Sequence, residues 1–313
     1  MLIFDAHCDT ASEILDRKTA LRANACHFDL ERARTAGGSR AQVFAAFVHP
    51  VGCRNTETRR ALEIIDNLYL HCEQNSDRMS VCTNTAEIEK AIGENKLAAL
   101  ISVEGGEALQ GRLSTLRMFY RLGVRSLGLT WNYRNELADG AWETSSGGGL
   151  SGFGRSVVSE MNRLGMLVDV SHISEKGFWD VIELSAAPVM ASHSNSRSVC
   201  DHPRNLTDSQ FEALKSKRGV AGINVNPFFL NNTGSASLDD VIRHIEHFAS
   251  LGGEDHIGLG CDFDGIECTP SDVRGVEDVP RIFERLLSLN YKEEFVRKFA
   301  GGNMLRVFSE VIG

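Results

Sequence analysis

The sequence predicts a closed parallel (β/α)8 barrel, and three observations indicate it. Eight short apolar runs, rich in β-branched residues, alternate along the chain with longer segments of helical periodicity. The length of 313 residues suits such a barrel as one domain, which we expect to span 1–313. Ionisable residues recur where the apolar runs end, as they do at barrel sites. A doubly wound open sheet is the alternative.

Each expected strand is a run of four to eight mostly apolar residues, the length typical of a buried parallel strand. In chain order the expected strands are 2–7, 41–48, 97–104, 124–131, 165–172, 188–193, 219–225 and 256–263. The helical patterns that separate them include 55–72, 153–164, 174–185, 207–216 and 238–251. This alternation predicts a TIM-like barrel with its helices outside the strands.

Two segments lie outside this alternation. The stretch "ETSSGGGLSGFG" (143–154) is too polar and glycine-rich for a core element. We expect it to form a loop after the fourth strand, either a cover over a substrate or a plain connection. The C-terminal stretch 291–311 predicts two extra helices, broken at Gly301 and Gly302, that pack outside the barrel.

The composition narrows the class of partner. A formal net charge of -9 disfavours nucleic acid and anionic membrane surfaces, which require a basic face. No apolar run approaches the roughly 20 residues of a membrane span, and no basic segment precedes the short apolar start. We therefore expect a cytoplasmic protein with a small-molecule substrate. The eight cysteines form no C-x-x-C pair, which favours reduced structural thiols.

Candidate metal ligands follow several of the expected strands. In a barrel the carboxyl ends of parallel strands meet on one face, so these side chains are expected to converge there. The candidates are His7 and Asp9 where the first strand ends, Glu104 at the end of the third, His172 at the end of the fifth, His193 at the end of the sixth, and Asp262 and Asp264 at the end of the eighth. A single histidine or aspartate at a strand end usually only caps the backbone or forms a local hydrogen bond. So many of them on one face of the barrel indicate a metal site.

Imidazole nitrogens and carboxylate oxygens are ligands for zinc, and the same set also suits manganese, iron or cobalt. Two such ions about 3.5 to 4 Å apart need a bridging carboxylate and together generate hydroxide near neutral pH. Glu104 is the expected bridge, because "SVEGGEA" gives it neighbouring glycines on which the backbone can pack closely. Asp5, two residues before His7, is expected to share its face and to orient a ligand or an ordered water.

Strand and helix periodicity exclude other candidates. Cys8 and Cys261 lie between candidate ligands and are expected to point away from them as packing residues. His244 and His247 lie three residues apart on an expected helix, on the face opposite its apolar residues, which predicts solvent exposure. His256 opens the eighth strand, at the wrong end of the barrel for chemistry.

Seven segments, in order, resemble the renal (membrane) dipeptidase family of metallopeptidases, peptidase family M19, in its soluble bacterial-type form. The segments are "DAHCD", "SVEGGEAL", "GLSGFGRSVVSEMNRLGMLVDVSH", "SHSNSRSVCDHPRNLTD", "GLGCDFDG", "GVEDVP" and "GNMLRVF". They extend from residue 5 to residue 307, so the resemblance covers nearly the whole chain.

The resemblance implies two zinc ions in a TIM-like barrel and a role for each matching residue. His7 and Asp9 would bind one ion, His172 and His193 the other, and Glu104 would bridge them. Arg204, in "HPRNL", matches the arginine that holds the terminal carboxylate of the substrate, a role for which a planar guanidinium is well suited. Asp262 matches the acidic residue that carries a proton from attacking water to the leaving amine. The family's frequent homodimer is a further implication.

One segment departs from the family pattern. Characterised dipeptidases of the family commonly have a histidine after "LT" at the end of the fourth strand, placed to stabilise the tetrahedral oxyanion. Here the stretch is "GLTWNYRNELADG", with Trp131 and Asn132 at this point. Asn132 is a candidate donor to that oxyanion, as asparagine is in other enzymes. Trp131 is a candidate for shaping the substrate side-chain pocket.

The predicted function is zinc-dependent hydrolysis of dipeptides, in which a metal-bridging hydroxide attacks the scissile carbonyl. An amidohydrolase acting on N-acyl amino acids or lactams would share the ligands and remains an alternative. A phosphotriesterase-like enzyme is less favoured, because that class uses a modified lysine as its bridge and no suitable lysine lies at a strand end. The non-enzymatic alternative is a protein that binds metal but catalyses no reaction.

Overall fold

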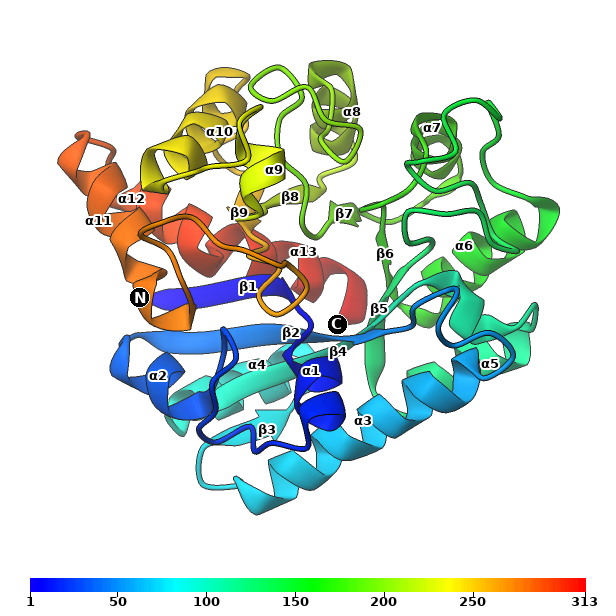
Figure 1. Cartoon of the computed structure of the whole chain (residues 1–313), viewed down its shortest axis with the longest axis horizontal. Helices are drawn as coiled ribbons and strands as arrows, with labels where there is room; N and C mark the ends of the chain where they lie inside the picture. Colours follow the sequence, from blue (N-terminus) through cyan, green and yellow to red (C-terminus); the bar gives the residue numbers. More distant parts are fainter.

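The chain forms a closed barrel of parallel strands surrounded by helices, as a computed structural model that describes residues 1–313 shows (Figure 1). The ring closes because β2 pairs with β4 and β9 pairs with β1. Its strands are β1 (Leu2–Cys8), β2 (Ser39–Phe47), β4 (Leu97–Glu104), β5 (Val124–Gly128), β6 (Leu167–Asp169), β7 (Val189–Ala191), β8 (Val220–Ile223) and β9 (Ile257–Leu259). The predicted TIM-like fold is confirmed, and the open sheet is excluded.

Every expected strand overlaps an observed one, but several observed strands end earlier than expected. The run 165–172 contains only Leu167–Asp169 as regular strand, and 256–263 contains only Ile257–Leu259. Apolar character continues past the last paired residue because the chain stays buried where it leaves the sheet. One strand was missed: β3 (Met79–Val81), which pairs with the start of β4 and adds no member to the ring.

The predicted helices are present with bounds close to those expected. The helices before the C-terminal segment are α1 (Thr10–Arg17), α2 (Leu30–Thr35), α3 (Glu57–Gln74), α4 (Thr85–Gly93), α5 (Leu113–Arg121), α6 (Gly152–Leu164), α7 (Glu175–Leu184), α8 (Asp208–Ser216), α9 (Pro227–Leu230), α10 (Leu238–Ser250) and α11 (Pro280–Ser288). The predicted loop 143–154 is confirmed up to Ser151, which caps α6 by accepting the Gly154 N–H. None of the helices has the length and apolar character that a membrane crossing requires.

The C-terminal helices do not break at the glycine pair. Instead α12 (Glu293–Arg297) continues through a π-helical turn (Lys298–Gly302) into α13 (Asn303–Ile312). Glycine is needed at 301 because a Cβ there would lie 2.9 Å from the Leu2 carbonyl oxygen. The turn therefore lets the helix approach β1 closely.

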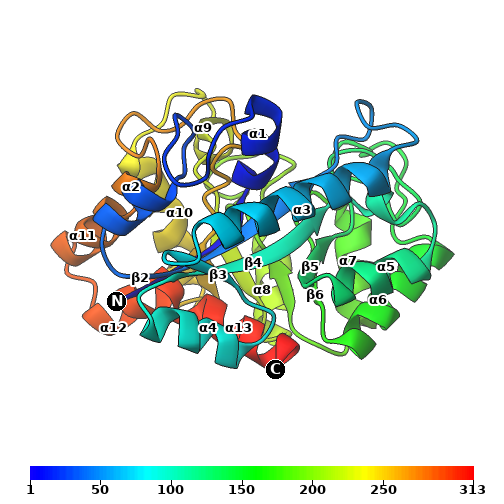
Figure 2. The same cartoon turned by 90° about the horizontal axis from the view of Figure 1, so that it is seen from below.

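Helix α13 closes one end of the barrel. In Figure 2 it lies with α4 at the opposite end of the molecule from α1 and α9. Its apolar side chains join inward-facing strand residues in a separate apolar cluster, in which the Phe4 and Phe308 rings lie 5.0 Å apart. Because Phe4 lies near the start of β1, α13 covers the end where the strands begin. The other end, where the strands finish, is left for a site.

Candidate metal centre

The strand ends bring five of the predicted residues together beside a single cleft. His7 and Asp9 follow from β1, Glu104 ends β4, and His172 and His193 lie just beyond β6 and β7. Each of these side chains is buried. Asp262 joins them from the segment after β9. His172 and Asp262 are held with left-handed backbone, at φ of 66° and 63°, which is uncommon outside glycine and recurs at functional sites.

Three carboxylates surround the His7 ring. The His7 Nε2 atom lies 3.3 Å from Asp9 Oδ2, 3.3 Å from Glu104 Oε2 and 3.8 Å from Asp262 Oδ1. Nε2 forms no hydrogen bond of normal geometry although it is buried, and Asp9 Oδ1 is also without a donor. Buried polar atoms are rarely left in this way, so the arrangement has the character of a ligand set.

Glu104 lies between this group and a pair of imidazoles, those of His172 and His193. While its Oε2 faces His7, its Oε1 lies 3.0 Å from His172 Nε2 and 3.8 Å from His193 Nε2. The two Nε2 atoms lie 2.7 Å apart, so both rings point at the same place. One carboxylate therefore stands between two groups of nitrogen and oxygen atoms.

The outer nitrogens of these two rings are held by hydrogen bonds. His172 Nδ1 donates to Asn132 Oδ1 at 2.8 Å. His193 Nδ1 lies 2.7 Å from Ser192 Oγ, which donates in turn to the Asp169 carboxylate. Both contacts place the ring proton on Nδ1 and leave the Nε2 lone pair available, the arrangement usual for metal-ligating histidine. The contact also occupies the oxygen of Asn132, whose predicted role toward an oxyanion stays a prediction.

The ionisation of the imidazoles suits a metal. Burial, together with the nearby Arg204 cation, lowers the pKa of His172 to about 3. Burial likewise lowers the pKa of His193 well below its ordinary value. Although burial opposes it, the Glu104 and Asp9 carboxylates raise the pKa of His7 well above its ordinary value. Two imidazoles are thus neutral and able to act as ligands, and the third, His7, lies among negatively charged carboxylates.

The carboxylates repel one another in this buried space. Burial and the Glu104 charge raise the pKa of Asp9 to about 6. Burial raises the pKa of Asp262 to about 7, with Asp9 and Glu104 adding to the effect. Glu104 itself stays ionised, because His7 and His172 outweigh its burial and hold its pKa well below the ordinary value. A divalent cation here would relieve this repulsion, so the residues fit such an ion.

Two groups of potential ligand atoms lie close enough together to hold an ion. The first joins His7, Glu104 and His193, and the second joins His7, Asp9 and Asp262, with the atoms of each group within 4.8 Å of one another. His7 belongs to both groups. Mixed imidazole and carboxylate sets of this kind are typical of zinc and neighbouring transition metals.

Asp5 does not share the face of His7. The pairing between β1 and β2 shifts by one residue between Asp5 and Cys8, so a bulge turns His7 inward while Asp5 stays outward. The Asp5 Oδ1 atom accepts the backbone N–H groups of His7 at 3.2 Å and Cys261 at 3.0 Å. The expectation that Asp5 shares the face of His7 was wrong, but its bond to the His7 N–H agrees with a role in orienting that candidate ligand through the backbone.

The cysteines, His244 and His256 can now be placed. Cys8 and Cys261 lie in the apolar core as predicted, and all eight cysteines are unpaired. His256 lies before β9, at the end of the barrel far from the cleft, also as predicted.

His244 was expected in solvent but is fully buried: its Nδ1 accepts the Ser196 N–H, and its Nε2 donates to the Leu230 carbonyl. Because it lies three residues after Val241 and four before Phe248, His244 shares the apolar face of α10 and not the opposite one, which is why the expectation was wrong.

Arg204 is a buried cation without a carboxylate partner. Its side chain is 3% exposed, Nη2 donates to the His193 carbonyl oxygen at 3.2 Å, and buried Nε has no acceptor. Burial lowers its pKa to about 10, so the group stays charged at neutral pH. An incomplete set of acceptors around a buried guanidinium indicates a place for an anionic group from outside.

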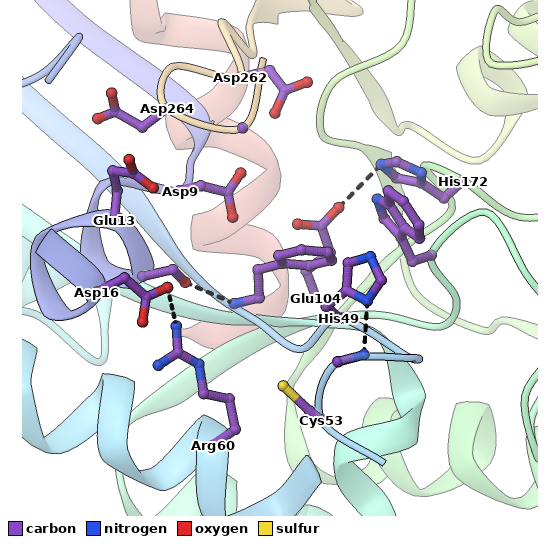
Figure 3. A pocket seen from close by; sticks show the side chains of 15 residues that line it. Asp9, Glu13, Asp16, His49, Cys53, Arg60, Glu104, His172, Asp262 and Asp264 are labelled. Atoms are coloured by element: carbon purple, nitrogen blue, oxygen red, sulfur yellow. Dashed lines mark hydrogen bonds and ion pairs between the residues drawn. The ribbon is translucent and has the colours of Figure 1, made fainter. Parts of the chain in front are cut away.

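The cleft has a volume of about 510 Å³ and two unlike sides. Figure 3 shows Glu13, Asp16 and Asp264 gathered on one side of it, and His49 and His172 on the other. Trp131 also lines it, with its ring 5.4 Å from that of His49 and 6.0 Å from that of His172. The predicted position of Trp131 beside a substrate side chain is consistent with this wall.

Asp264 differs from Asp262 in its partners. Its carboxylate accepts hydrogen bonds from Thr10 Oγ1 and from the His27 backbone N–H, each at 2.6 Å. It therefore ties the loop after β9 to the segment before α2. Asp264 belongs to neither group of potential ligand atoms, in contrast to Asp262.

The Asp169–Ser192 pair was not found from the sequence, because serine and aspartate at strand ends are common. We expect Ser192→Ala to weaken metal binding by about 10- to 100-fold, since it removes the acceptor that fixes the His193 proton. The measurement is the metal content after dialysis against graded chelator. Ser156→Ala, at an exposed helix position, is the matched control. Equal retention by both variants would contradict the role of Ser192.

Glu107 is a second buried carboxylate, and it faces no ligand. It is 8% exposed, neither oxygen has a hydrogen-bond partner of normal geometry, and burial raises its pKa from 4.5 to about 7. Because the folded pKa is the higher one, stability is retained below about pH 4.5 and lost as pH rises toward 7. The loss amounts to about 3 kcal/mol once the group is ionised.

Glu107→Gln is therefore expected to raise the free energy of unfolding at pH 8 and to change it little at pH 4.5. Urea denaturation with saturating metal at both pH values measures the effect. An equal gain at both values would mean that burial of the charge is not its cause.

The whole chain matches known proteins over this architecture. The family model for membrane dipeptidase (peptidase family M19) matches residues 1–312. The dipeptidase tcpJ of Claviceps purpurea is 38% identical over 273 residues, which are 86% of this chain and 62% of that longer protein.

Among solved structures, the metallopeptidase "dipeptidase AC" of family M19 has a TM-score of 0.93 at 30% identity, covering 100% of this chain and 99% of its own. A metallopeptidase from Rhodobacter sphaeroides, solved with a phosphinate mimic of the dipeptide L-Ala-D-Ala, has a TM-score of 0.91 at 30% identity, with 99% of both chains covered.

Proposed function

Because the chain belongs to the membrane dipeptidase family, peptidase family M19, and is a metallo-dipeptidase, we propose that it hydrolyses dipeptides at a centre of two zinc ions. The position of Glu104 carries the proposal, since its two oxygens face two separate groups of ligand atoms. His7 and Asp9 would hold one ion, and His172 and His193 the other. Residues 1–313 would act as one domain.

Side chains of the protein itself would transfer the proton that hydrolysis requires. When bound, such ions polarise a carbonyl group and make water acidic enough to act as a nucleophile near neutral pH. During hydrolysis the water oxygen bonds to the carbonyl carbon, the C–N bond breaks, and the amine nitrogen gains a proton. We assign that proton transfer to Asp262. Asn224 Nδ2 holds its Oδ2 at 2.9 Å, which leaves Oδ1 facing the centre.

Arg204 would hold the terminal carboxylate of the substrate. It lies against the His193 backbone and is close enough to the centre for its charge to act on His172. A carboxylate would complete the acceptors of the buried guanidinium through two parallel hydrogen bonds. This requirement restricts the substrate to peptides whose terminal carboxylate lies one residue beyond the bond cleaved.

Arg204→Met is expected to raise KM for dipeptides by about 10²- to 10³-fold, the value of a buried charge-assisted pair. Dipeptide amides, which lack the carboxylate, should be affected far less by the same substitution. Hydrolysis rates for matched acid and amide substrates test this. Arg197→Met is the control, because Arg197 donates to backbone carbonyls of its own loop. Equal losses for acid and amide substrates would contradict carboxylate binding.

The function itself is tested by metal analysis together with a substrate panel. We expect two equivalents of metal per chain and hydrolysis of L,L and L,D dipeptides by the zinc-loaded protein. Fewer than two equivalents would refute the binuclear centre. Cleavage of N-acetylated amino acids but not of dipeptides would establish the amidohydrolase alternative, and metal binding without any cleavage would indicate a binding protein.

A further inference from the structure

Hydrolysis places negative charge on the carbonyl oxygen, and a positioned N–H or O–H group next to that oxygen stabilises it. Most donors that line the cleft are already engaged within the chain. Ser12 Oγ donates to the Ala45 carbonyl, and Arg60 Nη2 donates to Asp16 Oδ2 at 2.7 Å. His172 donates its Nδ1 proton to Asn132. His49 is a lining side chain with a ring nitrogen that is still free.

The position of His49 follows from the pairing of β2 with β4. Phe47 is the register partner of Glu104, and the Val48 N–H donates to the Glu104 carbonyl at 3.2 Å. His49 lies two residues beyond Phe47, and the two rings are 6.0 Å apart. The imidazole therefore stands on the same wall as Glu104, one step further toward the mouth of the cleft (Figure 3).

The loop that follows determines which nitrogen of His49 carries the proton. Its Nδ1 accepts the backbone N–H groups of Val51 at 3.2 Å and Gly52 at 3.1 Å. Nδ1 is thus an acceptor, and the neutral ring must carry its proton on Nε2. Nε2 makes no hydrogen bond within the chain. Packing against Trp131 holds the plane of the ring, with the centroids 5.4 Å apart.

We propose that His49 is a further catalytic residue, whose Nε2–H donates a hydrogen bond to the carbonyl oxygen of the scissile peptide bond as that oxygen becomes negative. The inference rests on the proposed dipeptidase function and names a residue that this function did not include. Trp131 would act through His49 by holding the ring. His49 transfers no proton in this step and acts only as a hydrogen-bond donor.

The test compares two substitutions of His49 in the zinc-loaded protein. His49→Phe keeps an aromatic ring against Phe47 and Trp131 but removes the donor, whereas His49→Gln keeps an N–H donor. We expect His49→Phe to lower kcat by about 10²- to 10³-fold with KM and metal content near the wild-type values. His49→Gln should recover part of the loss. Val51→Ala, an exposed side chain in the same loop, is the control.

A phosphinate mimic of the dipeptide supplies a second readout. Its tetrahedral oxygens resemble the developing oxyanion, so His49→Phe should weaken its binding by the same factor by which kcat/KM falls. A merely structural role would not produce this agreement. Unchanged kcat in His49→Phe, or a loss confined to KM with phosphinate binding intact, would overturn the proposal. If the zinc-loaded wild type cleaves no dipeptide, the proposed function fails and this inference fails with it.

Discussion

Replacing Glu104 with alanine is expected to remove both metal ions and to lower dipeptide hydrolysis by about three to five orders of magnitude. The size follows from losing the several kcal/mol that metal ions contribute to stabilising charge during hydrolysis. The two oxygens of Glu104 face His7 on one side and His172 on the other, so both halves of the proposed centre depend on this carboxylate. Metal analysis of the purified variant and its turnover at saturating dipeptide measure the two effects.

Glu107→Gln is the matched control for this variant. Glu107 lies three residues later in the same segment and is equally buried, but it faces no ligand atom. It should keep both metal ions and its turnover. A Glu104→Ala protein that still bound two ions would show that the two groups of ligands do not depend on a shared carboxylate.

Asp262→Asn is expected to lower kcat by about 10²- to 10⁴-fold while both metal ions remain bound. That range is typical for loss of a positioned proton carrier. The amide keeps the size and the Asn224 contact of the carboxylate but cannot take up a proton at neutral pH. Asparagine also tolerates the left-handed backbone at this position, where φ is 63°. Turnover and metal content are measured on the same preparation.

Asp264→Asn tests whether the effect is specific. It makes the same chemical change two residues away, again at left-handed backbone with φ of 68°, in a carboxylate bonded to Thr10 and His27. We expect less than a tenfold change in kcat. Equal losses in both variants would mean that the charge of the loop, rather than a proton carried by Asp262, supports the reaction.

The barrel was predictable because each strand is a compact apolar run and the helical patterns between them are clear. The positions of ionisable residues at the strand ends then predicted which side chains would lie together, although not the distances between their atoms. β3 was missed because a three-residue strand carries too little pattern. The bulge in β1 was missed because the alternation of side chains along a strand assumes regular pairing. A single extra residue puts Asp5 and His7 on opposite faces of the sheet, although they lie two positions apart.

The candidate site was predictable in its residue types but not in its supporting contacts. The bond from Ser192 to Asp169 joins residues 23 positions apart, and nothing local marks either as a partner of a ring nitrogen. The burial of His244, by contrast, follows from its spacing of three and four residues to Val241 and Phe248, whereas its partners Ser196 and Leu230 lie in distant segments with no local signal. His49 carries no motif, and its relevance depends on register between β2 and β4.

The spread of the candidate ligands along the chain has a consequence for biosynthesis. His7 precedes Asp262 by 255 positions and precedes the barrel-closing α13 by more, so it leaves the ribosome well before either of them. The non-local pairing between β1 and β9 must wait until β9 has emerged, so neither the ring nor the proposed metal centre can be completed before then. We therefore expect a nascent chain stalled before β9 to remain an open intermediate that retains no metal, and one stalled after α13 has emerged to bind it.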